Sequence, residues 1–223
     1  MEFLDALDVR DLEPLVDLSE QHQAASIDYS HEYKLLLRYF VGLLQREERS
    51  ERVLLITEQL LNINPAHYTV WEFRRQSLVA LQKNLMAELD FVDAFTDGNP
   101  KNYQIWYHRR ALALLIGPVA ADREKEFTEL VFDEDAKNYH AWAHRQSIVS
   151  AFSSWEGELE LAERFIAADL RNNSAWNHVR RAPHLRRLDH SSPFLTCLCF
   201  QLVLTIRLEV VCCFREIEWS PSL

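Results

Sequence analysis

Lys101 is the residue whose type and position point most directly to chemistry. The sequence pattern predicts that it lies in the first turn of a helix, between Pro100 and Asn102. A helix N-terminus offers free amides and positive potential, so a lysine there opposes helix stability but would favour a bound anion such as a diphosphate. An alternative of equal weight is that Lys101 is simply a solvated lysine near acidic helices. Later copies of the segment carry Lys137 and Arg171 at this position, which would extend a basic rim over three helix ends.

His140 and His144 stand four residues apart, on one face of a predicted helix. This spacing is compatible with metal binding, but no third ligand is close in the sequence, so we expect no metal site. Other copies of the segment carry Thr69 and Gln104 where this copy has His140. A position that varies within a repeat is free to specialise. His144, in contrast, recurs as a histidine in two other copies, which favours a role in packing.

The composition fits a helix-rich globular domain. Hydrophobic residues make up 48% of the 223 residues, charged residues make up 26%, and only four residues are glycine. The net charge of -10 argues against a nucleic-acid surface, where basic residues should dominate. The acidic start "MEFLDALDVRDLEPL" does not have the pattern of a secretory signal. A glycine-rich phosphate loop and a nucleophile elbow are also absent from the repeat-containing sequence.

The cysteines and the longest apolar run both lie near the end of the sequence. The first 196 residues contain no cysteine, which predicts a cytoplasmic protein rather than a disulfide scaffold. The apolar run at 194–206 is shorter than the roughly 20 residues that span a bilayer, so we expect no transmembrane segment. The four cysteines are Cys197, Cys199, Cys212 and Cys213.

Four tryptophans recur at nearly constant spacing. Trp71, Trp106, Trp142 and Trp176 are separated by 35, 36 and 34 residues. A period of this length predicts a solenoid of helical hairpins, because one such hairpin cannot bury its apolar face alone. The predicted fold class is therefore all-α, an α-α superhelix. Residues 1–28 are interpreted as an N-terminal arm, 29–181 as the repeats, and 182–223 as a divergent tail.

Each copy predicts one aromatic helix and one shorter amphipathic helix. The shorter helices correspond to "LMAELDFVDAFTD", "DREKEFTELVFDED" and "WEGELELAERFIAAD", which carry apolar residues at intervals of three and four residues. We expect Pro65 and Pro100 in first helical turns, where no amide donor is needed, and Asn99 and Asp135 as N-caps.

The recurring arginines and aromatics are interpreted as packing residues. Tyrosine and tryptophan would fill the space between stacked helices. The arginines three residues after each tryptophan would pair with acidic residues on neighbouring repeats; these are Arg74, Arg109 and Arg145.

The repeats resemble a known family. The segments "HYTVWEFRR", "KNYQIWYHRR", "KNYHAWAHRQ" and "NNSAWNH" are similar to the α subunit of protein farnesyltransferase and geranylgeranyltransferase type I, from about residue 29 to residue 178. The resemblance implies a crescent of helical hairpins wrapped around a β subunit. It also implies zinc on that β subunit, magnesium with the prenyl diphosphate, no cofactor bound by this chain, and transfer of farnesyl or geranylgeranyl to the cysteine of a C-a-a-X protein.

The resemblance also implies roles for individual residues. Lys101 would stabilise the diphosphate leaving group, and Gln104 would bond the C-terminal carboxylate of the protein substrate. Tyr68 would line the peptide end of the site. Four further residues would lie around the diphosphate: Tyr103, Asn138, Tyr139 and His140.

The sequence departs from the family pattern after His178. Val179 stands where the family has an arginine, and the tail does not continue the repeat, so we expect a truncated or altered C-terminus. Two other functions stay open. One is a tetratricopeptide-like interaction scaffold without chemistry, although the Trp-x-x-Arg pattern differs from that repeat. The other is the α subunit of the Rab-specific prenyltransferase, which shares the tryptophan repeat.

Overall fold

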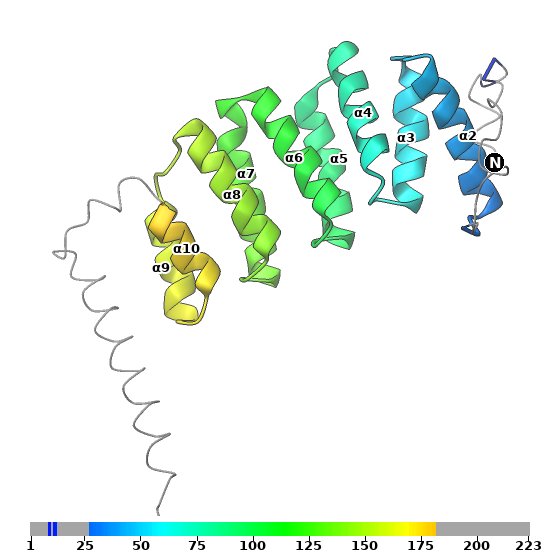
Figure 1. Cartoon of the computed structure of the whole chain (residues 1–223). Helices are drawn as coiled ribbons and strands as arrows, with labels where there is room; N and C mark the ends of the chain where they lie inside the picture. The colour runs from blue at the N-terminus through cyan, green and yellow to red at the C-terminus, as the bar shows by residue number, and fades with distance from the viewer. Residues whose placement is uncertain (1–8, 10, 13–26, 182–223) are drawn as a thin grey trace, which may run out of the picture. The chain divides into compact units, whose positions relative to one another are not determined.

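The computed structural model describes residues 9, 11–12 and 27–181 (Figure 1). These residues form nine α-helices and one short 3-10 helix. No helix among them has the length and apolar character needed to cross a membrane. The predicted tail at 182–223 and its cysteines lie outside the described residues, as does most of the predicted arm at 1–28.

The described helices fall into two compact units that divide after Ser154. The first unit contains α2 (His31–Gln45), α3 (Glu51–Ile63), α4 (Tyr68–Ala80), α5 (Leu85–Gly98), α6 (Tyr103–Ile116), the 3-10 helix η1 (Pro118–Ala120), α7 (Ala121–Glu134) and α8 (Tyr139–Phe152). The second unit contains α9 (Glu158–Ala168) and α10 (Asn173–Arg181).

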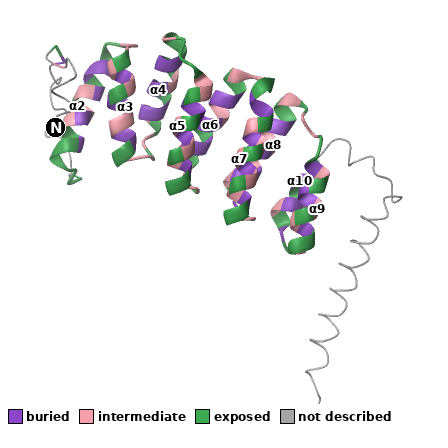
Figure 2. Cartoon of the chain, turned by 180° about the vertical axis from the view of Figure 1, so that it is seen from behind, coloured by how far each residue is buried: buried purple, intermediate pink, exposed green. Residues whose placement is uncertain are grey.

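Consecutive helices pack as hairpins in the order that the repeat predicts. In the first unit α2 packs on α3, α3 on α4, α5 on α6, and α7 on α8, while the aromatic helix α6 also contacts α4 and α8 (Figure 1). In the second unit α9 packs on α10. Buried segments face the neighbouring helices and exposed segments face outward (Figure 2). The prediction of an all-α fold built from helical hairpins is confirmed.

The aromatic helices begin later than predicted. Asn102 and Asn138 are the N-caps of α6 and α8, because each side-chain oxygen accepts bonds from two backbone amides of the first turn. Asn99 and Asp135, which were expected to be N-caps, instead terminate α5 and α7. Pro100 therefore lies in the turn before α6 and not in its first helical turn, and Pro65 stands in the equivalent turn before α4.

Each of these turns is held by its own tryptophan. In all four copies the indole N–H donates to the carbonyl oxygen six residues earlier, over 2.8 to 3.0 Å. The bond folds the turn back over the helix that follows it. The repeated tryptophan thus satisfies a polar group while filling the space between helices. The four acceptors are Pro65, Pro100, Ala136 and Leu170.

The short described part of the N-terminal segment docks on α2 and α3. Leu12 is buried in the first apolar cluster. The Asp11 carboxylate accepts bonds from Arg46 at 3.0 Å and from Arg52 at 2.7 and 2.9 Å. The hydrogen bond from Arg52 holds the pKa of Asp11 below its ordinary value. The segment therefore covers the open edge of the first hairpin.

A buried carboxylate ties three successive helices together. Glu88 on α5 accepts two bonds from Arg74 on α4, at 2.7 and 2.8 Å, and contacts His108 on α6 at 3.2 Å. All three side chains are buried. Burial alone would raise the pKa of Glu88, but the bonds from His108 and Arg74 outweigh burial and lower it.

The next repeat contains the same arrangement. Glu124 on α7 accepts two bonds from Arg109 on α6, at 2.7 and 2.8 Å, and contacts His144 on α8 at 2.6 Å. We call each such set of arginine, glutamate and histidine a clamp. The predicted pairing of Arg74 and Arg109 with acidic residues of a neighbouring repeat is confirmed. Arg145 pairs at 3.3 Å with Glu129, which lies on the preceding helix α7.

The helices one repeat earlier, α2, α3 and α4, carry aromatic or aliphatic residues at the corresponding positions. One repeat length before Glu88 and His108 the chain has Val53 and Phe73, which belong to one buried apolar cluster. Tyr39 replaces the arginine and packs against that cluster. The three positions therefore change together, because an unpaired carboxylate or arginine would be costly in the core.

We predict that Glu124→Gln lowers the free energy of unfolding by about 3 to 5 kcal/mol. The substitution replaces the carboxylate that accepts two bonds from the fully buried Arg109 guanidinium and leaves Asp93, at the edge of the core, as its remaining charged partner. Urea denaturation of the chain followed by circular dichroism measures the change. Asp90→Asn is the matched control, since its carboxylate is 73% exposed where it pairs with Arg123, and it should cost less than about 1 kcal/mol. Equal losses for the two variants would contradict the clamp.

The clamp histidines should make stability depend on pH. Burial lowers the pKa of His108 and of His144 from the ordinary 6.5, against the opposing effect of the bonded carboxylates. In both rings Nε2 bonds the glutamate, and Nδ1 is buried without a hydrogen-bond partner among the described residues. Adding a proton would create a buried donor with no acceptor, so the folded state keeps these rings neutral.

The free energy of unfolding should therefore fall as the pH drops below 6.5, where only the unfolded chain takes up the proton. Each histidine contributes at most about 1.4 kcal/mol per pH unit. His144→Phe, which copies the natural Phe73, should flatten the slope between pH 6.5 and 5, whereas the exposed His31→Phe should not. An unchanged slope in His144→Phe would refute this assignment. Glu124 adds a second loss at lower pH, since its pKa is held at about 2 in the folded state.

Candidate functional site

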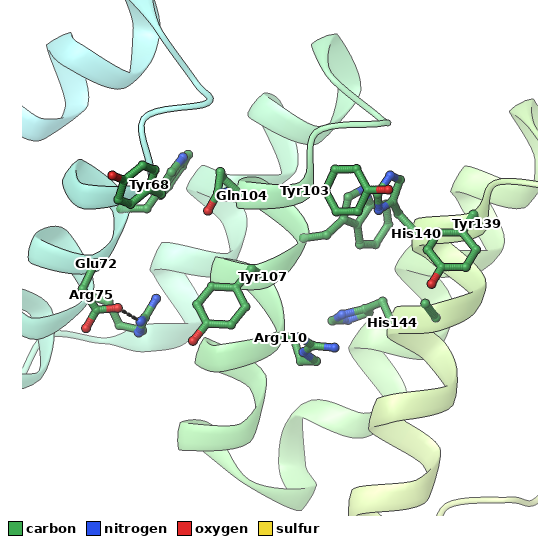
Figure 3. A pocket seen from close by; sticks show the side chains of 13 residues that line it. Tyr68, Glu72, Arg75, Tyr103, Gln104, Tyr107, Arg110, Tyr139, His140 and His144 are labelled. Carbon is green, nitrogen blue, oxygen red and sulfur yellow. Dashed lines mark hydrogen bonds and ion pairs between the residues drawn. The ribbon is translucent and has the colours of Figure 1, made fainter.

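A groove of about 620 Å³ lies along the exposed sides of α4, α6 and α8 (Figure 3). All of its lining residues belong to these three aromatic helices, which the clamps hold beneath it. The lining residues are Tyr68, Trp71, Glu72 and Arg75 from α4, Tyr103, Gln104, Trp106, Tyr107 and Arg110 from α6, and Tyr139, His140, Ala143 and His144 from α8.

Five of the seven residues proposed from the sequence lie together in this groove. Each comes from the first turn of its helix, directly after the turn that its tryptophan holds. The three tyrosines expose 68 to 70% of their surface, so their rings stand at the rim. The five residues are Tyr68, Tyr103, Gln104, Tyr139 and His140.

His140 is partly buried and packs against two aromatic rings. Its ring meets Tyr103 edge-on at 4.3 Å between centroids, and it lies nearly parallel to Trp106, with 11° between the ring planes. Partial burial lowers the pKa of His140 below its ordinary value. The ring is thus favoured as neutral imidazole, which can both donate and accept a hydrogen bond.

The other end of the groove carries residues that the sequence analysis did not select. The guanidinium carbons of Arg75 and Arg110 lie 5.3 and 5.8 Å from the centre of the Tyr107 ring. Arg75 also pairs with Glu72. The spacing of Tyr103, Tyr107 and Arg110, at four and three residues, places them on one helix face and could have revealed this end of the groove.

Lys101 and Asn138 are not among the lining residues. Lys101 precedes the N-cap Asn102 and so lies in the turn before α6, not in the first helical turn as predicted. Its side chain is 77% exposed, and its ammonium lies 3.8 Å from a carboxylate oxygen of Asp135. Asn138 is buried at the start of α8. Their proposed roles remain predictions.

The helix amides expected to bind an anion are already engaged. The Asn102 side-chain oxygen accepts bonds from the amides of Gln104 and Ile105, at 2.9 and 3.5 Å. The Asn138 side chain does the same for His140 and for the residue after it. An anion near Lys101 would therefore meet capped helix ends, and the lysine side chain would supply the positive charge.

The histidine pair His140 and His144 does not form a ligand pair. His144 bonds the clamp carboxylate of Glu124, while His140 faces the tyrosine rim. Among the described residues no group of three or more histidine, cysteine, aspartate or glutamate side chains could hold a metal ion.

The model of the protein prenyltransferase alpha subunit repeat matches the chain at four places, residues 50–81, 85–115, 121–152 and 155–182. Together these segments cover more than half of the sequence. The chain belongs to this family. Each matched segment contains one of the four repeated tryptophans, so the period found in the sequence is the period of the family repeat.

Relatives within the family are α subunits named protein farnesyltransferase/geranylgeranyltransferase type-1. The one from Arabidopsis thaliana is 43% identical over 171 residues, covering 77% of this chain and 52% of the relative. The one from Dictyostelium discoideum is 37% identical and covers 95% of this chain and 64% of the relative. The chain thus spans between about half and two thirds of the length of these relatives.

A solved structure has the same fold. It is described as Candida albicans protein geranylgeranyltransferase-I complexed with GGPP, and it matches with a TM-score of 0.69 and 35% identity. The match covers 78% of this chain and 60% of that chain. The all-α superhelical fold predicted from the repeat is therefore confirmed.

We predict that Tyr103→Ala raises the pKa of His140 towards its ordinary 6.5. The edge-on Tyr103 ring helps to keep water from the imidazole, and burial is what lowers this pKa. Titration of the histidine ring signals by nuclear magnetic resonance measures the shift. Tyr68→Ala is the control, because Tyr68 is an equally exposed rim tyrosine on α4 that makes no ring contact with His140 in the described structure. A pKa that does not change in Tyr103→Ala would show that the ring does not shield His140.

Proposed function

We propose that this chain acts as the α subunit of a heterodimeric protein prenyltransferase. With a β subunit it would support transfer of a farnesyl or geranylgeranyl group from the diphosphate to the cysteine of a C-a-a-X protein. The observation that carries the proposal is the groove on α4, α6 and α8 in a chain whose relatives bear this name. The absence of cysteine from the repeats favours a cytoplasmic protein.

In this proposal the α subunit supplies the rim of a shared site. The exposed ammonium of Lys101 would stabilise negative charge on the departing diphosphate. Tyr103, Tyr139 and His140 would donate hydrogen bonds around it, and their place at one end of the groove supports this role. Gln104 would bond the C-terminal carboxylate of the peptide. Tyr68, across the groove on α4, would line the peptide end.

The metal ions of the reaction would be bound outside this chain. A zinc ion on the β subunit would make the substrate cysteine a thiolate, and magnesium would accompany the diphosphate. This division agrees with the residue types in the groove, which are aromatic, amide, imidazole and guanidinium groups with a single carboxylate, Glu72. The residues of this chain would bind, orient and exclude water.

The Rab-specific enzyme is the second candidate. The α subunit of geranylgeranyl transferase type-2 from Mus musculus is 28% identical over 174 residues, less than the type-1 relatives. A scaffold without chemistry would not need the rim residues that set the second copy apart. Both observations favour the first proposal.

The test is reconstitution with a co-expressed β subunit of the type-1 enzymes. Single-turnover transfer to a C-a-a-X peptide should occur in the complex and not with the chain alone. Lys101→Ala should slow the chemical step by about 10- to 150-fold, which corresponds to the roughly 1.5 to 3 kcal/mol of one charge-assisted contact. It should change isoprenoid affinity much less, because the charge develops in the transition state.

Lys137→Ala is the matched control, since Lys137 occupies the same position one repeat later and should have the smaller effect. Turnover by the chain without a second subunit would overturn the proposed division of labour. A chemical step that is unchanged in Lys101→Ala and lost in Lys137→Ala would show that the active lysine is Lys137 and that our assignment to Lys101 is wrong.

A further inference from the structure

The turn that carries Lys101 is held by a bond from the next repeat. The side-chain amide of Asn138 donates to the carbonyl oxygen of Pro100 over 3.2 Å, across 38 residues of sequence. Asn138 is only 2% exposed. Because Pro100 directly precedes Lys101, this bond joins the start of α8 to the backbone from which the lysine side chain emerges.

The other end of the same side chain has a separate task. The Asn138 oxygen accepts bonds from the backbone amides of His140 at 2.9 Å and Ala141 at 3.1 Å, and so caps α8. Both ends of this buried side chain are thus committed to the protein. This arrangement suits a residue that orients its neighbours better than one that contacts a substrate.

The equivalent residue one repeat earlier does not make this bond. Asn102 caps α6 in the same way, but in the described part of the chain its amide makes no bond to Pro65. The Pro65 oxygen accepts the indole N–H of Trp71, just as Pro100 accepts that of Trp106. The tryptophan bond is therefore general, and the bond from Asn138 distinguishes the turn of Lys101 from the turn before α4.

A second contact links the same two turns. The Lys101 ammonium lies 3.8 Å from Asp135, which ends α7 and accepts the backbone amide of Asn138 through its carbonyl oxygen. The ammonium itself stays largely in solvent, with the side chain 77% exposed. The base of the lysine is thus fixed by a partly buried hydrogen bond, while its ammonium group is exposed and can meet an anion.

We propose that Asn138 is a positioning residue for Lys101, acting through the Pro100 carbonyl and not through contact with substrate. The inference rests on the proposed function, in which Lys101 stabilises the departing diphosphate. Loss of the bond would let the turn shift relative to α8, and displacement of a charged group by about 1 Å is enough to lower a rate severalfold or more.

The test is a double-mutant cycle in the complex with the β subunit. Asn138→Ser keeps a hydroxyl that can cap α8 and removes the amide donor. It should slow single-turnover chemistry by roughly tenfold and leave isoprenoid affinity within about twofold. In a Lys101→Ala background the same substitution should change the rate by less than about twofold, because the group that it positions is gone.

Asn84→Ser is the capping control. Asn84 caps α5 by accepting bonds from Met86 at 3.0 Å and Ala87 at 3.4 Å, and it does not line the groove. Its replacement should leave the rate within about twofold in both backgrounds. Asn138→Asp, which retains the capping oxygen, serves as the second variant if Asn138→Ser does not fold.

Equal slowing by Asn138→Ser with and without Lys101 would overturn the inference, since Asn138 would then act independently of the lysine. A Lys101→Ala complex with a normal rate would instead overturn the proposed role of the lysine. A measurement on the chain alone separates the two cases. Amide hydrogen exchange at Lys101 and Asn102 should be faster in Asn138→Ser than in Asn84→Ser, and equal exchange would refute the structural part of the inference.

Discussion

The buried carboxylates of Glu88 and Glu124 are the constraint on which the row of helices from α4 to α8 depends. Each carboxylate accepts hydrogen bonds from an arginine on the preceding helix and contacts a histidine on the following helix. Apolar packing is non-directional, whereas these bonds fix three helices in one register. A carboxylate in this environment is stable only while both partners are present, so the register cannot slip without a large cost.

The geometry of the groove depends on these clamps, because they fix the helices that line it. His144 belongs to one clamp through Glu124, yet its ring also lines the groove and lies 5.5 Å from the ring of Trp106. Trp106 in turn holds the Pro100 carbonyl that precedes Lys101. A continuous set of contacts therefore runs from the buried carboxylate to the turn where the proposed chemistry takes place. The residues that differ between α6 and α8 therefore lie above two clamps that have the same arginine, glutamate and histidine.

The period of the tryptophans was sufficient to predict the hairpins, because a 35-residue repeat of helical pattern leaves few other folds. The pairing of Arg74 and Arg109 also followed from their position in the repeat. The helix starts were placed wrongly at Asn99 and Asp135, since two residues able to cap a helix lie three positions apart in each copy, and in the structure the later one is the cap. The bonds of the clamp histidines depend on contacts between helices, which no local pattern encodes. The groove end at Tyr107 was missed although its residues share one helix face, because helical spacing alone does not show which face is open.

Lys101 is held more weakly than the arginines of the clamps. Arg74 and Arg109 are bonded bidentately by carboxylates at 2.7 to 2.8 Å, and Arg75 in the groove has Glu72 beside it. Lys101 has one contact at 3.8 Å with a partly exposed aspartate. An exposed pair of this kind is worth less than about 1 kcal/mol. A diphosphate, which carries more charge than one carboxylate, would replace Asp135 at little cost. In the proposed function the protein thus commits its strong ion pairs to the scaffold and leaves a loosely paired lysine, on a firmly fixed turn, for an anion that must bind and then leave.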